Sequence, residues 1–255
     1  MATERNTQHN MTDYQQTRRE FVWEAPEDYN FAIDTIGEWA RDPEKLAMLW
    51  VGPDGREERY TFANFDEQSS RVARALERLG VQKGERVLMM LPRIPEWWET
   101  ALGLMKLGAI VIPCTTLLTP KDIVYRAEVA EAVAFITDKA GAEKLALVRD
   151  QCPTLRFAMV VDEPGAECPA ECVGYHPTVD VASPVWYDRR TVASDPCLIY
   201  FTSGTVGYPK MVLHTHASYP LGHTVVTGRY WLDLRPDDLH WNLSEMGWAK
   251  AAWSN

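Results

Sequence analysis

Long hydrophobic runs and an excess of positive charge are both missing from this sequence. No uninterrupted apolar run approaches the roughly 20 residues that a membrane-spanning helix requires, so we expect no membrane insertion. Lysine and arginine number 26 against 36 aspartate and glutamate residues, and the formal net charge is −10. An acidic balance of this kind argues against nucleic acid or an anionic membrane surface as the main partner.

Cysteine is scarce, and its placement excludes a disulfide framework. The five cysteines form an odd number without a regular spacing, which is typical of a reduced, cytoplasmic compartment. Cys168 and Cys172 could flank a metal ion, but no second pair accompanies them. Residues 1–20 are polar and have the features of neither a secretory signal nor a transit peptide. We therefore expect a cytoplasmic protein without a metal site of its own.

Two common catalytic motifs are absent as well. A Walker loop needs four residues between its glycines and then Gly-Lys-Ser/Thr. Here two residues separate Gly204 from Gly207, and Pro209 stands where the second Walker glycine would be. The Gly-x-Ser-x-Gly elbow of serine hydrolases does not occur either.

What the chain does contain is a steady alternation of strand and helix patterns. Short apolar runs occur at Arg86–Leu91, Ala109–Pro113, Val133–Thr137 and Phe157–Val161. Helical patterns occupy about Phe62–Leu79, Pro95–Leu107, a segment capped by Thr119, and about Ala140–Gln151. Repeated strand–helix–strand units favour parallel pairing. The sequence therefore predicts an α/β fold with layered parallel or mixed sheets flanked by helices.

Changes in composition suggest three parts. Residues 1–20 are predicted to be a disordered lead-in. Residues 21–195 are predicted to form a first α/β subdomain that ends in a proline-rich connecting loop at 162–195. Residues 196–255 are predicted to begin a second α/β subdomain, truncated at its end, with a strand at Met211–His214 and then a helix to about Trp231.

Residues 199–210 carry most of the functional information. They read Ile-Tyr-Phe-Thr-Ser-Gly-Thr-Val-Gly-Tyr-Pro-Lys. Glycines let backbone N–H groups face an anion without a Cβ in the way, while hydroxyls add donors and Lys210 adds a positive charge. The predicted polyphosphate site comprises Thr202, Ser203, Gly204, Thr205, Val206, Gly207, Tyr208, Pro209 and Lys210. The alternative interpretation is a glycine-rich hairpin without a ligand.

This run resembles the phosphate-loop signature of the adenylate-forming enzymes, which include acyl-CoA synthetases, aryl-acid ligases and luciferases. The pattern (Thr/Ser)-Ser-Gly-(Thr/Ser)-x-Gly-x-Pro-Lys is matched, and the one departure is Val206, where the family usually has Thr or Ser. That substitution removes one potential phosphate donor. The resemblance covers about residues 21–255, and within the family the chain most resembles the medium-chain and aromatic acyl-CoA synthetases.

A second motif of that subgroup is recognisable at His240–Trp248, where Glu245 and Met246 depart from the usual Ser-Asp-Thr-Gly-Trp. The resemblance implies that a small carboxylic acid, medium-chain or aromatic, attacks Mg-ATP to give an acyl-adenylate, which then passes to coenzyme A. It implies ATP, Mg²⁺ and coenzyme A as the small molecules required. Lys210 is the expected catalytic residue, because its charge would offset that of the departing pyrophosphate. Gly247 and Trp248 are the expected wall of the substrate pocket.

The family's later motifs would lie beyond Asn255, so the resemblance implies the N-terminal portion of a longer enzyme. The missing C-terminal part of its own chain would then be a partner, and the fragment alone is expected to be inactive. Two alternatives stay open. One is an adenylation enzyme that loads a carrier-protein thiol, and the other is a non-catalytic fragment that binds nucleotide.

Overall fold

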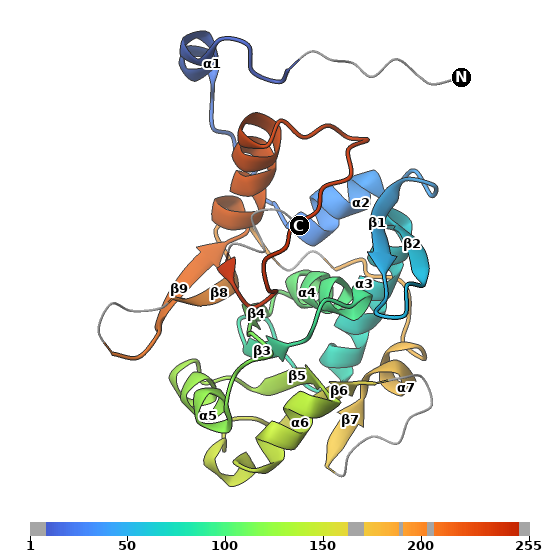
Figure 1. The fold of residues 1–255 in the computed structure, drawn as a ribbon, viewed down its shortest axis with the longest axis vertical. Helices are drawn as coiled ribbons and strands as arrows, with labels where there is room; N and C mark the ends of the chain where they lie inside the picture. Colours follow the sequence, from blue (N-terminus) through green and yellow to red (C-terminus); the bar gives the residue numbers. More distant parts are fainter. Residues whose placement is uncertain (1–8, 163–170, 189–190, 203–206, 250–255) are drawn as a thin grey trace.

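A seven-stranded sheet is the centre of the computed structural model, which describes residues 9–162, 171–188, 191–202 and 207–249. Its strands are β3 (Arg86–Met90), β4 (Ile110–Pro113), β5 (Ala134–Asp138), β6 (Phe157–Val161), β7 (Cys172–Gly174), β8 (Pro196–Thr202) and β9 (Lys210–Thr215). They lie in the order β7-β6-β5-β3-β4-β8-β9 (Figure 1). All neighbours pair in parallel except β8 and β9, which are antiparallel. The predicted α/β fold with a mostly parallel sheet is confirmed.

Helices cover both faces of this sheet. In chain order, the described helices are α1 (Tyr14–Glu20), η1 (Phe31–Thr35), α2 (Ile36–Trp39), α3 (Phe62–Arg78), α4 (Pro95–Leu107), α5 (Pro120–Val129), α6 (Lys139–Ala146), η2 (Arg149–Gln151), α7 (Tyr175–Val179), η3 (Ala217–Leu221) and η4 (His223–Trp231). A separate antiparallel hairpin, β1 (Leu46–Val51) with β2 (Glu57–Thr61), packs beside α3 (Figure 1). Among the described residues, no helix has both the length and the apolar character that crossing a membrane requires.

Strand β3 shows how the two faces are separated. Val87 and Met89 belong to the core cluster that contains residues of α3, α4 and α7. Leu88 and Met90 belong to the other cluster, with Ile123 of α5 and Leu145 of α6. Successive side chains of a strand point to opposite faces, so a nearly continuous apolar run serves two helical layers. The hydrophobic strands of the sequence are therefore those of a sheet covered on both sides.

Local capping explains where the predicted helices begin and end. At the start of α5 the Thr119 side chain accepts from the Asp122 amide, while the Asp122 carboxylate accepts from the Thr119 amide at 2.9 Å, a complete capping box. Pro120 occupies the first helical position, where no N–H is needed. Helix α4 ends at Gly108, which adopts φ 80°, the left-handed conformation that favours glycine.

Three segments differ from the sequence-based expectation. Within the predicted connecting loop 162–195, β7 adds a parallel edge strand to β6 and α7 packs on α3. The helix predicted at about Ala140–Gln151 ends earlier than expected, since α6 stops at Ala146 and the 3₁₀ turn η2 follows. Within the predicted disordered lead-in, α1 forms with Asp13 as its N-cap, although none of its residues is buried. Strands β8 and β9 extend the sheet formed by earlier residues, and the proposed subdomain division stays a prediction.

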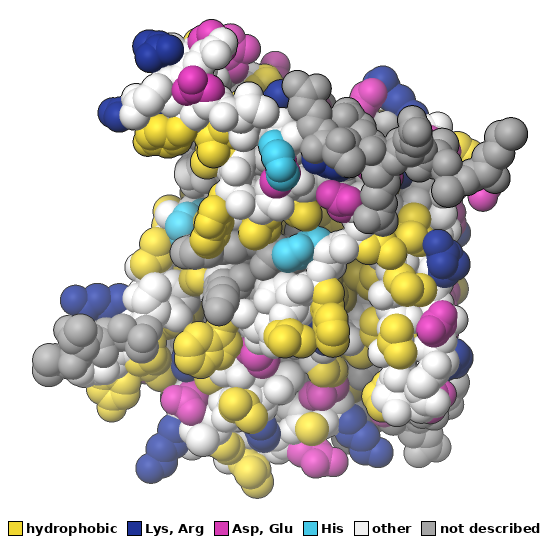
Figure 2. Space-filling view, turned by 45° about the horizontal axis from the view of Figure 1, so that its top comes forward, with side chains coloured by type: hydrophobic (Ala, Val, Ile, Leu, Met, Phe, Trp, Pro, Cys, Tyr) yellow, Lys and Arg dark blue, Asp and Glu magenta, His cyan; other side chains and the backbone are white. Residues whose placement is uncertain are grey.

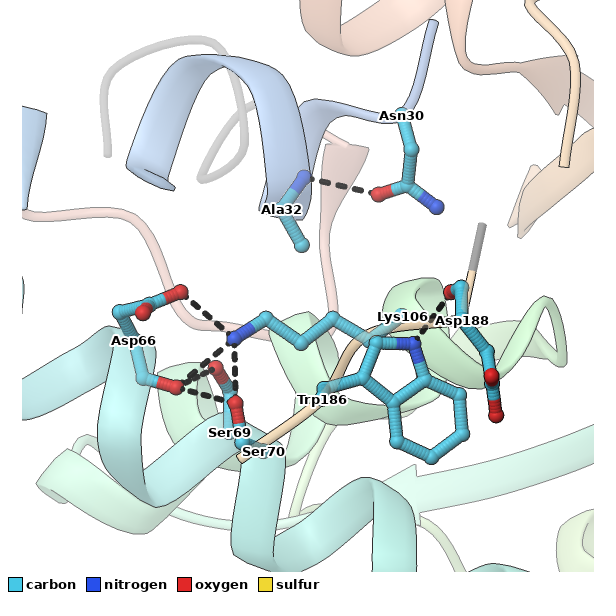
Figure 3. A network of polar contacts seen from close by, with 8 residues as sticks. All are labelled: Asn30, Ala32, Asp66, Ser69, Ser70, Lys106, Trp186 and Asp188. Carbon is cyan, nitrogen blue, oxygen red and sulfur yellow. Dashed lines mark hydrogen bonds and ion pairs between the residues drawn. The ribbon is translucent and has the colours of Figure 1, made fainter. Parts of the chain in front are cut away.

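A buried lysine joins the two long helices of one layer (Figure 3). The Lys106 side chain on α4 is 2% exposed, and its Nζ donates to the Asp66 carboxylate at 2.7 Å, the Asp66 carbonyl at 2.7 Å and the Ser70 hydroxyl at 2.8 Å. Burial lowers the pKa of Lys106, and the Asp66 charge opposes that shift. All three donors of the ammonium group are therefore satisfied by α3.

We expect Asp66→Ala to lower the free energy of unfolding by about 2 kcal/mol, because it leaves the buried Lys106 charge without a counterion. The loss is less than that of a fully buried pair, since the carbonyl of residue 66 and the Ser70 hydroxyl remain. Lys106→Met is the matched control and should cost less, because the Asp66 side chain is 41% exposed and stays hydrated. Chemical denaturation measures both, and a larger loss for Lys106→Met would contradict this account.

Candidate functional site

The order of the parallel strands indicates a ligand site at their carboxyl ends. Strand β3 leads through α4 to β4 on one side, whereas β4 leads through α5 back to β5 on the other side of β3. This reversal of direction occurs at the carboxyl ends of β3 and β4, which is the usual ligand position in α/β sheets. Strand β8 is parallel to β4, so the predicted phosphate loop leaves the sheet at the same edge.

The predicted phosphate loop connects β8 to β9 as a hairpin. Thr202 and Lys210 are paired at its base, and the Thr202 hydroxyl donates to the Lys210 carbonyl at 3.4 Å. Gly207 adopts φ 97°, which a residue with a Cβ rarely does. Ser203, Gly204, Thr205 and Val206 lie outside the described residues. The two ends of the loop are thus held together, and both the hairpin and the phosphate-binding interpretations fit this geometry.

A second motif segment lies across the carboxyl ends of β3 and β4. Arg93, which follows β3, donates to the backbone carbonyls of Asn242 and Ser244. The Glu245 carboxylate accepts from the Thr116 amide at 3.2 Å and from the Gly247 amide at 2.8 Å. The segment is therefore attached to the residues that follow both β3 and β4.

The two departures in this motif both have packing roles in the structure. Glu245 makes the bridge to the residues after β4 just described, and Met246 is 2% exposed and joins the core that includes α4. A sequence pattern marks these positions only as unusual. The structure shows that they attach the segment to the sheet.

Gly247 and Trp248, predicted to line the substrate pocket, have different surroundings. A Cβ on Gly247 would lie 2.0 Å from the Thr115 nitrogen and 2.3 Å from the Cys114 carbonyl carbon, so this glycine packs directly on the backbone after β4. Trp248 is 61% exposed, and its indole is accessible to a ligand. Whether these two residues bind substrate stays a prediction.

We expect Gly247→Ala to lower the free energy of unfolding by about 2 kcal/mol, because backbone atoms cannot move aside for the new methyl group. Gly37→Ala is the matched control, since a Cβ there would meet nothing within 4 Å. Chemical denaturation of both variants provides the measurement. Equal stability of the two variants would show that segment 242–248 is not packed as described.

Exposed apolar side chains are numerous near the end of the described chain. Five of them belong to this region: Trp231, Leu239, Trp241, Leu243 and Trp248. Figure 2 shows hydrophobic side chains spread across the middle of one face of the molecule. Large exposed apolar patches mark ligand or protein contacts, so the surroundings of the second motif suit an apolar ligand group or a further packing partner.

Histidines near β9 contribute no positive charge at neutral pH. Burial lowers the pKa of His216 to about 4, and both of its ring nitrogens lack a hydrogen-bond partner among the described residues. Burial also lowers the pKa values of His214 and His223. In the part of the chain that the structure describes, no group of three or more His, Cys, Asp or Glu could hold a metal ion.

Sequence reasoning missed several residues at this edge. Arg93 anchors the second motif, and Thr115 and Thr116 provide the backbone on which it packs. Their place in the sequence could have indicated them. Arg93 and the Cys114–Thr116 run closely follow buried strands, where functional groups of α/β proteins gather. Their distant partners, more than a hundred residues later, had no sequence signal.

Known proteins resemble this chain over most of its length. The human mitochondrial acyl-coenzyme A synthetase ACSM3 is 37% identical over 259 residues, a match covering 98% of this chain and 43% of that relative. An acyl-CoA synthetase from Brucella canis has the same fold, with a TM-score of 0.81 at 26% identity, covering 95% of this chain and 45% of that one. The anthranilate CoA ligase AuaEII, solved in complex with anthranoyl-AMP, gives a TM-score of 0.69 at 26% identity, covering 78% and 37%.

The chain thus spans less than half the length of these relatives. The model of one protein family, described as AMP-binding enzyme, matches residues 37–254. The resemblance predicted from the loop at 199–210 is therefore confirmed at the level of the family. Because this match extends over most of its residues, the chain belongs to the family of AMP-binding enzymes.

Proposed function

We propose that this chain is the part of an acyl-CoA synthetase that holds the phosphates of ATP and one wall of the acid pocket. The whole protein would activate a medium-chain fatty or aromatic acid. The observation that carries the proposal is the position of two motif segments at neighbouring strands. Thr202 and Lys210 form the base of the loop that follows β8, and Glu245 binds the Thr116 amide after β4, the neighbour of β8. The carboxyl edge of the strands is where a mononucleotide and its substrate meet in α/β folds.

The proposed reaction has two steps. A carboxylate oxygen attacks the α-phosphorus of ATP, the bond to the bridging oxygen breaks, and pyrophosphate leaves. The thiolate of coenzyme A then attacks the acyl carbon, and AMP leaves with the electron pair of the broken acyl–oxygen bond. Both reactants of the first step are anions, so positive charge and orientation are what the protein must supply.

Within this proposal, Lys210 and the loop from Thr202 bind the β- and γ-phosphates. Lys210 is exposed at the first position of β9, at the base of the loop, and its ammonium would offset the charge on pyrophosphate. Because the chain as a whole is acidic, a polyphosphate needs positive charge close to it, and Lys210 supplies that charge. Mg²⁺ would enter with the phosphates of ATP and neutralise part of their charge, and coenzyme A would enter as a co-substrate.

Gly247 and Trp248 form the acid-binding wall in this proposal. The exposed indole suits an aliphatic chain or an aromatic ring. The solved relative AuaEII is an anthranilate ligase in complex with an aromatic acyl-adenylate, which supports an aromatic acid as one candidate substrate. The relatives are more than twice as long as the match, so we propose that the 255 residues alone bind ATP phosphates without completing the reaction.

The compartment proposed from the cysteines is the cytoplasm. Cys114, Cys152 and Cys197 are free thiols in the structure, which supports a reducing environment. Similar relatives carry "mitochondrial" in their names. Fractionation of cells that express the full-length gene product with a C-terminal tag distinguishes the two locations, and recovery with mitochondria would overturn the cytoplasmic proposal.

The test of function is carboxylate-dependent exchange of labelled pyrophosphate into ATP by the full-length gene product. Octanoate, butyrate and benzoate are compared at equal concentration, with and without coenzyme A. Exchange with octanoate or benzoate, and acyl-CoA formation when coenzyme A is added, is the expected result. A protein that unfolds cooperatively and binds ATP but shows no pyrophosphate exchange with any acid would overturn the proposed ligase function. That result would favour a nucleotide-binding role.

A further inference from the structure

One side chain of helix α5 contacts both sides of the base of the candidate phosphate loop. The Tyr125 hydroxyl donates to the Pro209 carbonyl at 2.9 Å. Its ring stacks on Tyr208, with centroids 4.7 Å apart and planes at 23°. The same ring meets Phe201 edge-to-face at 6.2 Å. Phe201 precedes the loop while Tyr208 and Pro209 end it, so Tyr125 bridges the two.

Helix α5 is a firm support for this side chain. Ile123 and Ala127 are fully buried and lie in one core cluster with Ile199 of β8. The capping box of Thr119 and Asp122 fixes the first turn of the helix. The position of Tyr125 is therefore set by the core and by the cap, and does not depend on the loop that it contacts.

On the β9 side, the described residues of the loop lie at the end of the sheet order. Strand β9 is last in the sheet order, and β8 is its only neighbour among the described strands. Tyr208 is 73% exposed in spite of its stack on Tyr125. Lys210 follows Pro209 directly, so fixing the Pro209 carbonyl also fixes where β9 begins and where the Lys210 side chain leaves the backbone.

We propose that Tyr125 is a positioning residue for the phosphate site, holding Tyr208 and Pro209 so that Lys210 is ordered before nucleotide binds. The inference rests on the proposed function, since it assigns the loop to the β- and γ-phosphates of ATP. Ordering a binding loop in advance lowers the entropy lost on binding. The effect of Tyr125 should therefore fall on the affinity for ATP and leave the acid unaffected.

The first test uses initial rates of pyrophosphate exchange by the full-length gene product. Tyr125→Phe removes the hydrogen bond and keeps the ring, and should raise KM for ATP about 5-fold. Tyr125→Ala also removes the stack and should raise it about 30-fold. KM for the acid should not change in either variant. Tyr29→Phe is the matched control, because it also removes a hydroxyl hydrogen bond, to Thr35 at 2.8 Å, in the segment that precedes η1.

A double-mutant cycle isolates the contact itself. Tyr125→Ala and Tyr208→Ala remove the same ring stack, so the double variant should raise KM for ATP by clearly less than the product of the two single effects. Amide hydrogen exchange adds a readout that needs no substrate. The amides of Tyr208, Lys210 and Met211 should exchange faster in Tyr125→Ala than in the wild type, while those of β3 should not change.

The outcomes separate this inference from the proposed function. Absence of pyrophosphate exchange in the wild type would overturn the proposed function. Amide hydrogen exchange would still decide whether Tyr125 orders Tyr208 and Lys210. Wild-type activity that Lys210→Ala abolishes, with an unchanged KM for ATP in both Tyr125 variants, would overturn the inference alone. Equal increases in KM for ATP and for the acid would show a general structural role and would overturn it as well.

Discussion

Lys210→Ala should reduce carboxylate-dependent pyrophosphate exchange in the full-length gene product by about 100- to 1,000-fold. This is the range typical of removing one group that stabilises developing negative charge in an active site. Lys210 is exposed at the beginning of β9, and only its backbone takes part in the sheet contacts described here. The melting temperature should therefore stay unchanged, so that the loss of exchange is a loss of chemistry.

Two further variants show whether the charge or its geometry matters. Lys210→Arg keeps the charge on a wider, planar group, and should retain more activity than the alanine variant but less than the wild type. Lys139→Ala removes an exposed lysine at the start of α6, which follows β5, three strands from β8 in the sheet order, and should have no effect. Full exchange in Lys210→Ala would remove Lys210 from the catalytic machinery.

The second large effect is a pH-dependent loss of stability caused by Glu99 on α4. Glu99 is 9% exposed, and its carboxylate accepts a hydrogen bond from the Tyr175 hydroxyl at 2.8 Å. Burial raises its pKa from 4.5 to about 7, with smaller contributions in the same direction from the charges of Glu96 and Asp180, while the hydrogen bond from Tyr175 lowers it. The neutral acid is thus favoured in the folded protein.

The direction of the pH effect follows from this raised pKa. Between pH 4.5 and 7 the folded state binds more protons than the unfolded state, so the free energy of unfolding falls as the pH rises. The stabilisation is fully present below pH 4.5 and is lost above pH 7. A difference of 7 − 4.5 = 2.5 pKa units corresponds to about 3 kcal/mol.

Glu99→Gln should remove this dependence, because an amide of similar shape stays neutral at every pH. We expect the variant to be about 3 kcal/mol more stable than the wild type at pH 8, and to differ little from it at pH 4.5. Urea denaturation at both pH values, compared as the difference between the two proteins, cancels the contributions of other titrating groups.

Tyr175→Phe provides a control of opposite sign for the same site. Because the Tyr175 hydrogen bond lowers the pKa of Glu99, its removal should raise that pKa further and steepen the loss of stability toward pH 8. Parallel pH profiles for the wild type and Glu99→Gln would show that Glu99 does not titrate in this range, and would contradict the account.

The α/β class, the positions of β3 to β6, the ends of α3 and α4 and the start of α5 could be predicted because they depend on local information. Apolar runs, the Thr119 cap and Gly108 act within a few residues of where they stand. The second motif at 242–248 could be recognised, but its position could not. Its contacts with Arg93 and Thr116 join residues far apart in the chain, and no periodicity encodes them.

By itself, the sequence determined the class of the fold, the family and the loop with the chemistry to bind phosphate, since each depends on short patterns of residue type. Only the tertiary structure decided which residues meet at the carboxyl edge of the sheet. It showed Glu245 and Met246 as anchors, Gly247 as a close contact with the Thr115 backbone, and Tyr125 in contact with Tyr208 and Pro209. The reason is physical: strand order and helix packing are set by the burial of the whole core, which no single segment specifies.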